Sequence, residues 1–141
     1  MKRIVELANL NLERNQIISI SFVGPGTIKR INREFVSHIG LTDVISFDYR
    51  DEYQHYNNDI AAELIIYPGM AALLASRRKS SSFAYEMVLY LVHGILHLTG
   101  ENDLMLKERA RMRRKERKII KMLQNEFSFE SIFQKHISET F

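Results

Sequence analysis

The chain has 141 residues, enough for one domain around a single hydrophobic core. It has no cysteine, which excludes disulfides and thiolate metal sites, and no apolar run approaches the ~18 residues of a membrane span. The net charge of +3 is too small alone to indicate a nucleic-acid partner. Glu6 interrupts the first apolar run, which argues against a signal peptide, so we expect a cytoplasmic protein.

The first half of the chain predicts mostly strands. Apolar and β-branched residues recur between turn signals over residues 2–7, 17–23, 43–49 and 63–67, and we predict a strand at each. Thr27 can cap a helix that runs to Phe35. The polar residues 50–59 indicate a loop or hairpin connection.

The second half predicts helices. One runs over about residues 70–78, and another over 83–98 is apolar nearly all round, which is typical of a buried central helix. After Gly100 we expect a basic helix with Met112, Ile119, Ile120 and Leu123 as its buried stripe. The tail, residues 126–141, has apolar residues at helical spacing that we expect to pack: Phe129, Ile132, Phe133 and Ile137.

Together these elements predict one α+β domain over residues 1–141. We expect a mixed sheet of about four strands packed on the central helix, with further helices on the other side.

Residues 93–103 are the most informative segment of the chain. His93 and His97 are one helical turn apart, so both rings lie on one face. Gly100 can end the helix in a left-handed turn, and the chain can then bring Asp103 back toward the rings. Two nitrogens and one oxygen leave a fourth position open, as in a catalytic zinc site.

Both histidines need polar partners inside a buried helix. Glu86, two turns before His93, can accept a hydrogen bond there or cap a neighbouring element. The alternative is a pair of core histidines bonded to the backbone. The spacing of the pair with Gly100 and Asp103 favours the metal.

Basic residues form two clusters that suit phosphate. One is Arg77, Arg78 and Lys79, and the other spans residues 107–121. A solvated helix face is an equal alternative for both.

The histidine spacing is shared with metzincin peptidases, whose general base is the glutamate directly after the first histidine. Here that position is Gly94. Without this carboxylate a zinc-activated water lacks its usual proton acceptor for amide hydrolysis, which disfavours a peptidase.

The segment also resembles a known family, the bacterial rRNA-maturation endoribonuclease YbeY. Its signature, His-Gly-x-Leu-His-Leu-x-Gly, is matched by residues 93–100. Residues 42–47 match the family block Thr-Asp-Val-Leu-Ser-Phe, while residues 62–66 and 31–36 match two further blocks more loosely. In order and spacing the resemblance covers about residues 17–123.

The resemblance implies one zinc ion held by three residues and hydrolysis of single-stranded RNA. It further implies maturation of the 3′ end of small-subunit (16S) rRNA beside the ribosome. It does not identify a general base; Asp43 and Glu63 are candidates for proton transfer, with a structural role at the strand ends as the alternative for each.

Three positions depart from the family pattern. Asp103 replaces the third histidine, which lowers Lewis acidity and leaves another divalent metal open; Glu101 is a nearer carboxylate, but the spacing favours Asp103. Val36 replaces an arginine, so phosphate would need another cation such as Arg33. Glu63 replaces an aspartate.

Three functions follow as hypotheses. The first is a metal-dependent endoribonuclease in which Arg77, Arg78 or the basic helix positions the RNA backbone. The second is a non-catalytic rRNA- or ribosome-binding protein with a structural metal, favoured by Val36 and Asp103. The third, which Gly94 disfavours, is a metallopeptidase.

Overall fold

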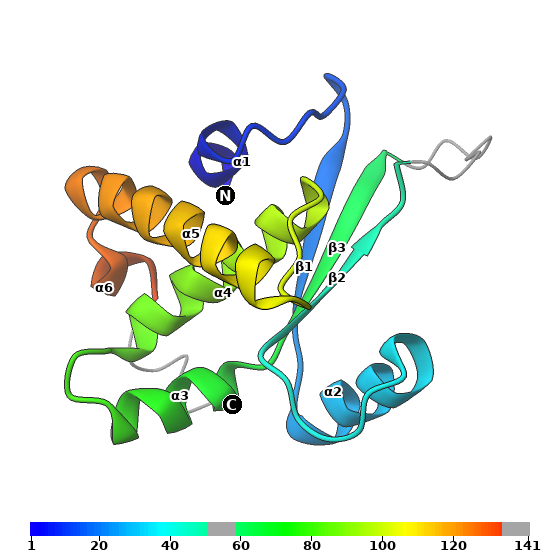
Figure 1. Ribbon diagram of the computed structural model, residues 1–141, viewed down its shortest axis with the longest axis vertical. Helices are drawn as coiled ribbons and strands as arrows, with labels where there is room; N and C mark the ends of the chain where they lie inside the picture. Colours follow the sequence, from blue (N-terminus) through cyan, green and yellow to red (C-terminus); the bar gives the residue numbers. More distant parts are fainter. Residues whose placement is uncertain (51–58, 134–141) are drawn as a thin grey trace.

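The computed structural model describes residues 1–50 and 59–133 (Figure 1). Its elements in chain order are α1 (Lys2–Leu7), β1 (Ile17–Phe22), α2 (Pro25–Ile31), the π-helical turn η1 (Asn32–Val36), β2 (Val44–Asp48), β3 (Ile60–Ile66), α3 (Pro68–Arg77), α4 (Phe83–Leu98), α5 (Leu106–Glu126) and α6 (Phe129–Ile132).

The three strands form a mixed sheet in the order β1-β3-β2. β3 lies in the middle, parallel to β1 and antiparallel to β2. Successive side chains on a strand point to opposite faces. On β3, Leu64 and Ile66 therefore join the core around α4, whereas Ile65 joins a smaller cluster on the other face.

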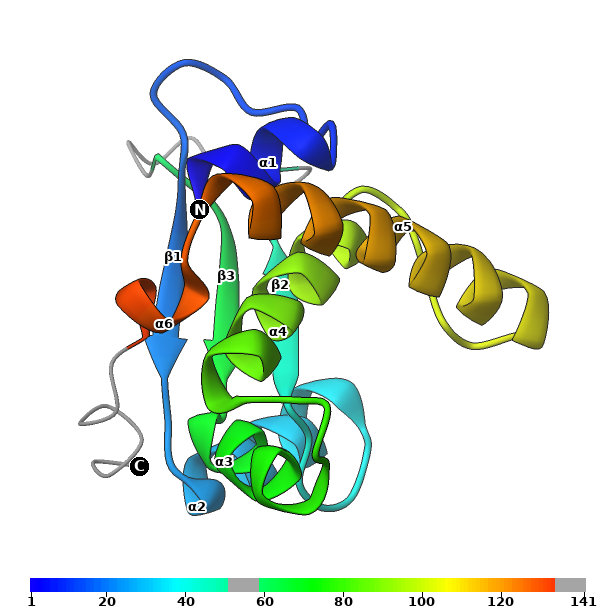
Figure 2. The same cartoon turned by 90° about the vertical axis from the view of Figure 1, so that its left-hand side faces the viewer.

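Helix α4 is the centre of the larger core and lies across the sheet (Figure 2). It begins where the Ser82 hydroxyl accepts a hydrogen bond from the Tyr85 backbone N–H at 3.1 Å, which is the usual N-cap contact. Helices α1, α3, α5 and α6 all contact it, so most of its circumference is buried. The prediction of a central buried helix over residues 83–98 is confirmed.

Gly94 lets α4 approach the sheet closely. A Cβ built at this position would lie 3.0 Å from Leu64 Cδ2 and 3.2 Å from Ser46 Oγ. The Ser46 hydroxyl also donates a hydrogen bond to the Gly94 carbonyl at 3.0 Å. The helix is thus held against β2 and β3 through the residue that follows His93, and Ser46 lines the same cavity as the two histidines.

The arrangement of the other helices differs from the prediction. On the face of the sheet away from α4, Ile28 of α2 packs on Ile45 and Ile65. Helices α1, α3, α5 and α6 gather around α4, because that helix is apolar nearly all round and must be covered on several sides.

The predicted strand at residues 2–7 was wrong, and three strands are present in the described residues instead of about four. The segment is helix α1, which packs Ile4 on α4 and α5 with Val5 and Ala8 at its border. Arg3 contacts Glu126 at 2.8 Å and so joins α1 to the end of α5. Six residues are too few for β-branched content to separate a strand from one buried helical turn.

The other predicted elements are confirmed with small shifts of their ends. The predicted cap at Thr27 was wrong, because α2 begins at Pro25 with Gly24 as its N-cap, and proline is well suited to the first helical position.

The buried stripe of the basic helix is the predicted one, and Phe133 is buried and Phe129 partly buried as expected. The prediction that Ile132 packs was wrong, because its side chain is 51% exposed. Most of the connection predicted at 50–59, and Ile137 of the tail, lie outside the described residues. Among the described helices none is long and apolar enough to cross a membrane.

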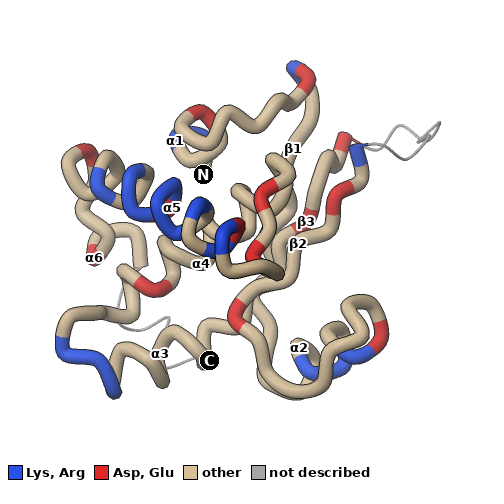
Figure 3. Tube along the Cα trace, in the orientation of Figure 1, with Lys and Arg blue, Asp and Glu red and all other residues tan. Residues whose placement is uncertain are grey.

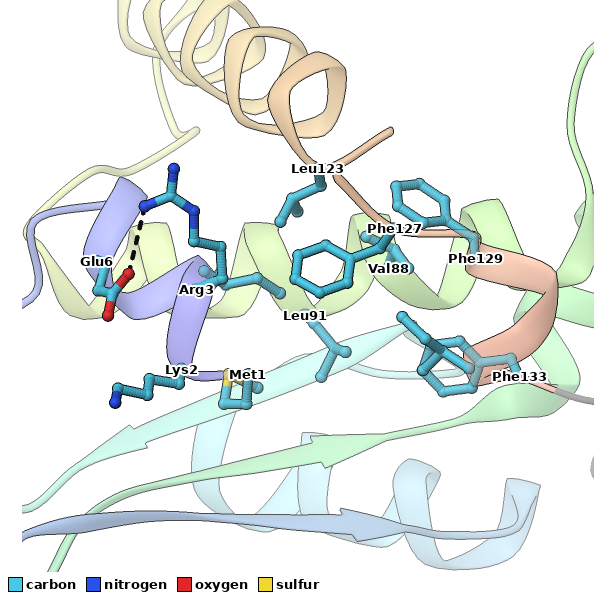
Figure 4. A pocket seen from close by; sticks show the side chains of 12 residues that line it. Met1, Lys2, Arg3, Glu6, Val88, Leu91, Leu123, Phe127, Phe129 and Phe133 are labelled. Carbon is cyan, nitrogen blue, oxygen red and sulfur yellow. Dashed lines mark hydrogen bonds and ion pairs between the residues drawn. The ribbon is translucent and has the colours of Figure 1, made fainter. Parts of the chain in front are cut away.

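An apolar cavity of about 470 Å³ lies between α1, α4 and the end of the described chain (Figure 4). Val88, Leu91 and Phe127 point into it. Its carboxylate, Glu6, already pairs with Arg3 at 3.3 Å. Besides this pair, Lys2 is the ionisable side chain of the described lining, so that lining offers no histidine and no second carboxylate for a metal ion or for acid–base chemistry.

Candidate metal centre

His93, His97 and Asp103 come together at the end of α4 and the loop after it. One ligand atom from each lies within 4.8 Å of the others. The two Nε2 atoms are 3.0 Å apart, and Asp103 Oδ2 is 3.6 Å from His93 Nε2. Zinc–ligand bonds of about 2.0–2.1 Å at tetrahedral angles place neighbouring ligand atoms roughly 3.3 Å apart. The spacing of the cluster therefore fits one small divalent ion.

The other ring nitrogens already have hydrogen-bond acceptors. His93 Nδ1 contacts a carboxylate oxygen of Glu116, and His97 Nδ1 donates to the Glu101 carbonyl at 3.0 Å. In neutral rings both protons then sit on Nδ1, so two Nε2 lone pairs face each other at 3.0 Å. Such an arrangement requires a proton or a cation between them. The two unprotonated Nε2 atoms and the nearby Asp103 carboxylate therefore form a donor set that suits a metal ion.

The two rings differ in basicity. Burial lowers the pKa of His93, but the hydrogen bond and charge of Glu116, with Asp43 and Asp103, outweigh it and leave that pKa above its usual value. Burial and the neighbouring His93 lower the pKa of His97. His97 is therefore the ring that more readily offers a free lone pair.

The turn after α4 is built on Gly100, as predicted. Its φ of +96° lies in the left-handed region, which a side chain disfavours. The Glu101 N–H donates to the Leu96 carbonyl and the Gly100 N–H to the His97 carbonyl, which together make a Schellman motif. This turn carries the Glu101 carbonyl to His97 and the following residues back toward the cluster.

The side chain of Glu101 points away from the metal cluster. Its buried carboxylate accepts from Arg111 Nε at 3.0 Å and also contacts Lys115. Lys115, followed by Arg111, outweighs burial and holds the pKa of Glu101 below its usual range. Asp103, not Glu101, is thus the carboxylate at the cluster, in agreement with the spacing argument.

Helix α5 anchors all three members of the cluster. Glu116 contacts His93, and the Glu101 that orients His97 is held by the basic side chains of α5. Arg109 Nε donates to the Asp103 carbonyl at 3.1 Å. Sequence reasoning missed Glu116. The sequence feature that could have revealed Glu116 is its position: it is an acidic residue in a basic helix, one turn after the buried Met112 and so close to the buried face.

A cavity of about 460 Å³ opens from the cluster toward η1 and β2. Asp43 lines it together with Asn32, Val36 and His38. One oxygen of Asp43 accepts from the Val44 N–H at 2.7 Å, which orients the carboxyl beside His93. His38 was not singled out from the sequence, since a lone histidine in a polar stretch carries no pattern.

A second cavity, of about 300 Å³, adjoins the cluster on the α5 side, where Tyr90 lines it. Burial, with the charges of Glu86 and Asp43, raises the pKa of Tyr90 well above its usual value. The phenol therefore stays protonated and does not act as a base.

Several other residues singled out from the sequence lie elsewhere. Glu63 accepts from the Tyr49 hydroxyl at 3.0 Å and alternates on β3 with the residues that face α4, so it does not line the cavity. Glu86 is buried, accepts from Ser81 at 2.7 Å and lies 3.8 Å from Arg78. Glu86 thus caps the turn before α4, the second of its two predicted roles, and does not contact the histidines.

The predicted RNA-binding residues are likewise not at the cluster. Arg33 is exposed on η1 and lies 3.9 Å from Glu34. Arg77, Arg78 and Lys79 lie at the end of α3. Neither group lines the cavities around the cluster, and Val36, at the family's arginine position, does.

Comparisons with known proteins agree with the site. The family model described as endoribonuclease YbeY matches residues 1–124. An endoribonuclease YbeY of Chlorobium phaeovibrioides is 32% identical over 125 residues, which cover 87% of this chain and 80% of that protein. One of Carboxydothermus hydrogenoformans is 33% identical over 110 residues, covering 78% of this chain and 74% of that protein.

The fold is also similar to a solved structure. The solution structure of TM1509 from Thermotoga maritima aligns with a TM-score of 0.55 at 20% identity, over 98% of this chain and 83% of that one. The matched family model spans the sheet, α4 and nearly all of α5, and so includes every residue of the cluster and its anchors. The chain belongs to the YbeY endoribonuclease family, whose members are metal-dependent hydrolases.

Proposed function

We propose that this protein is a metal-dependent endoribonuclease whose single metal ion is held by His93, His97 and Asp103. The observation that carries the proposal is the pair of Nε2 lone pairs 3.0 Å apart, with both Nδ1 atoms already engaged. A divalent ion bound there supplies Lewis acidity toward water and phosphate oxygens. Zinc fits the two imidazoles best, and the carboxylate leaves other divalent metals open.

The residues around the cluster have two further roles, which are to orient the metal ligands and to transfer protons. Glu116 and the Glu101 carbonyl fix the tautomer and the direction of each imidazole. Asp43 and His38 are ionisable groups that line the cavity beside the cluster, and we assign proton transfer to them in place of the more distant Glu63. The cavity gives a phosphodiester access to the open side of the cluster.

The substrate we propose is single-stranded RNA, with the 3′ end of small-subunit 16S rRNA as its biological target and the small ribosomal subunit as its partner. Family membership supports this substrate class. Residues 1–141 would form one such domain.

The test is cleavage of single-stranded RNA by purified protein with and without chelator, paired with metal analysis. We expect about one metal ion per chain, cleavage that the chelator stops, and loss of both in His97→Ala. His38→Ala should keep its metal and lose rate. Cleavage by His97→Ala at the wild-type rate would point to a contaminating nuclease and reject the proposal.

A non-catalytic RNA-binding protein with a structural metal is the second candidate, and Val36 is the observation that favours it, because among the described residues no lysine or arginine lines that cavity. It predicts salt-dependent RNA binding without turnover, and melting when the metal is removed.

The peptidase hypothesis gains nothing from the geometry. Gly94 supplies no carboxylate, and a side chain there would meet Leu64 and Ser46 of the sheet, so the packing of α4 leaves little room for the peptidase glutamate at this position. Cleavage of casein blocked by chelator would be needed to revive it.

A further inference from the structure

A groove between α4 and α5 leads away from the metal cluster. It begins with the cavity of about 300 Å³ that Asp43, His93 and Asp103 line. That cavity shares Leu89, Arg113 and Glu116 with a further one of about 220 Å³. The two cavities adjoin at these three residues, and together they are here called the α4–α5 groove.

One wall of this groove carries three arginines from successive turns of α5: Arg109, Arg113 and Arg117. Their spacing of four residues places them on one side of the helix, about 6 Å apart along its axis. All three are exposed, and we call them the arginine row. Figure 3 shows that α5 bears the longest basic stretch, away from the basic residues near α2 and at the end of α3.

Three acidic residues line the groove, and all are close to the metal cluster: Asp43, Asp103 and Glu116. Glu116 contacts His93, whereas among the described residues the side chains of Arg113 and Arg117 pair with no carboxylate. The floor between them is apolar, formed by Leu89 and Ile120, with Tyr85 at the far end. Cations over an apolar floor with an aromatic ring are the features that hold a single strand through its phosphates and bases.

We propose that the arginine row holds successive phosphates of the RNA strand as it runs from the metal cluster along the α4–α5 groove. The proposal rests on the proposed function for the identity of the strand. It selects three of the many basic residues of α5. Arg111 and Lys115 are engaged with Glu101 instead, and the remaining basic residues are exposed to solvent. The row also supplies, from the α5 side, the cationic contact that Val36 does not provide at the other edge of the site.

The test compares two double variants that remove the same charge. Arg113→Gln/Arg117→Gln removes the row beyond Arg109, which is spared because it also holds the Asp103 loop. Arg114→Gln/Lys118→Gln is the control, since both residues are exposed on the same turns and line neither cavity of the groove. Binding of a cleavage-resistant single-stranded 2′-O-methyl RNA is measured between about 50 and 200 mM salt.

Each lost phosphate contact reduces the slope of log K against log salt by about 0.7 for a single strand. We expect the row variant to bind less tightly with a slope smaller by about 1.4, and the control to stay close to wild type, with equal metal content in both. Equal losses in the two variants, or none in the row variant, would overturn the proposal. If the wild type fails to cleave RNA but the row variant alone loses slope, the row stands and the proposed catalytic function falls.

Discussion

The two walls of the metal centre are built differently. The α5 wall contacts His93 through Glu116 and the Asp103 carbonyl through Arg109. It reaches His97 indirectly, by holding the side chain of Glu101, whose carbonyl accepts from that ring. The wall from η1 and β2 lines an open cavity and reaches α4 chiefly through Ser46, which bonds the helix backbone. One wall therefore fixes the ligands, and the other leaves space in which a substrate can be bound.

The largest expected effect is that of removing the cluster's carboxylate. Removing a residue that only hydrogen-bonds a metal ligand typically weakens metal affinity by roughly 10–100-fold. Because Asp103 is itself a proposed ligand, Asp103→Ala should weaken metal affinity by at least that much. Metal titration monitored by a competing chelator measures this. Asp103→His is the matched control, since it restores the family's third histidine and should retain the ion.

Unchanged affinity in Asp103→Ala would show that the cluster holds its ion without this residue. The α5 wall would then orient only the two histidines, and the contact from Arg109 to the Asp103 carbonyl would serve the loop alone.

The sequence predicts this cluster well where the chemistry is local. His93 and His97 share a face because of the helical period, and Gly100 marks the left-handed turn that follows. These features depend on neighbours within one or two turns. The same holds for the buried stripe of α5, which its apolar spacing predicts correctly.

What the sequence did not predict depends on contacts between distant segments. Glu116 reaches His93 across 23 positions, and the direction of Glu101 is set by α5. The error at residues 2–7 has a similar cause, because Ile4 finds its environment on α4 and α5. Short-range patterns cannot rank such alternatives when a segment is only six residues long.

A smaller effect should follow when one contact of the α5 wall is broken. Glu116→Gln removes the charge that orients and polarises His93 while keeping its size, so we expect about 10–100-fold weaker metal binding with the fold retained. The same titration measures it, with circular dichroism as the check on folding. Glu34→Gln, on the exposed side of η1, is the control and should bind metal as the wild type does. Equal metal affinities in Glu116→Gln and Glu34→Gln would contradict the conclusion that the α5 wall fixes the metal ligands.

The smallest effect concerns the ion pairs that hold the turn after α4. Lys115, followed by Arg111, keeps the pKa of Glu101 low despite its burial. A carboxyl with a lowered pKa in the folded state stabilises the fold above its unfolded value of about 4.3 and loses that contribution as the pH falls through the folded pKa. Lys115→Met should therefore lower stability at pH 7 by about 1 kcal/mol, because Arg111 remains as a partner and water screens the exposed side of the pair.

Thermal melting across pH measures this difference. The gap between wild type and Lys115→Met should close as the solution becomes more acidic than the folded pKa of Glu101, whereas Lys118→Met should show no such gap at any pH. A gap that persists in acid would mean that Lys115 acts through packing of its methylene chain. The α5 wall would then hold the Glu101 carbonyl against His97 by shape and not by charge.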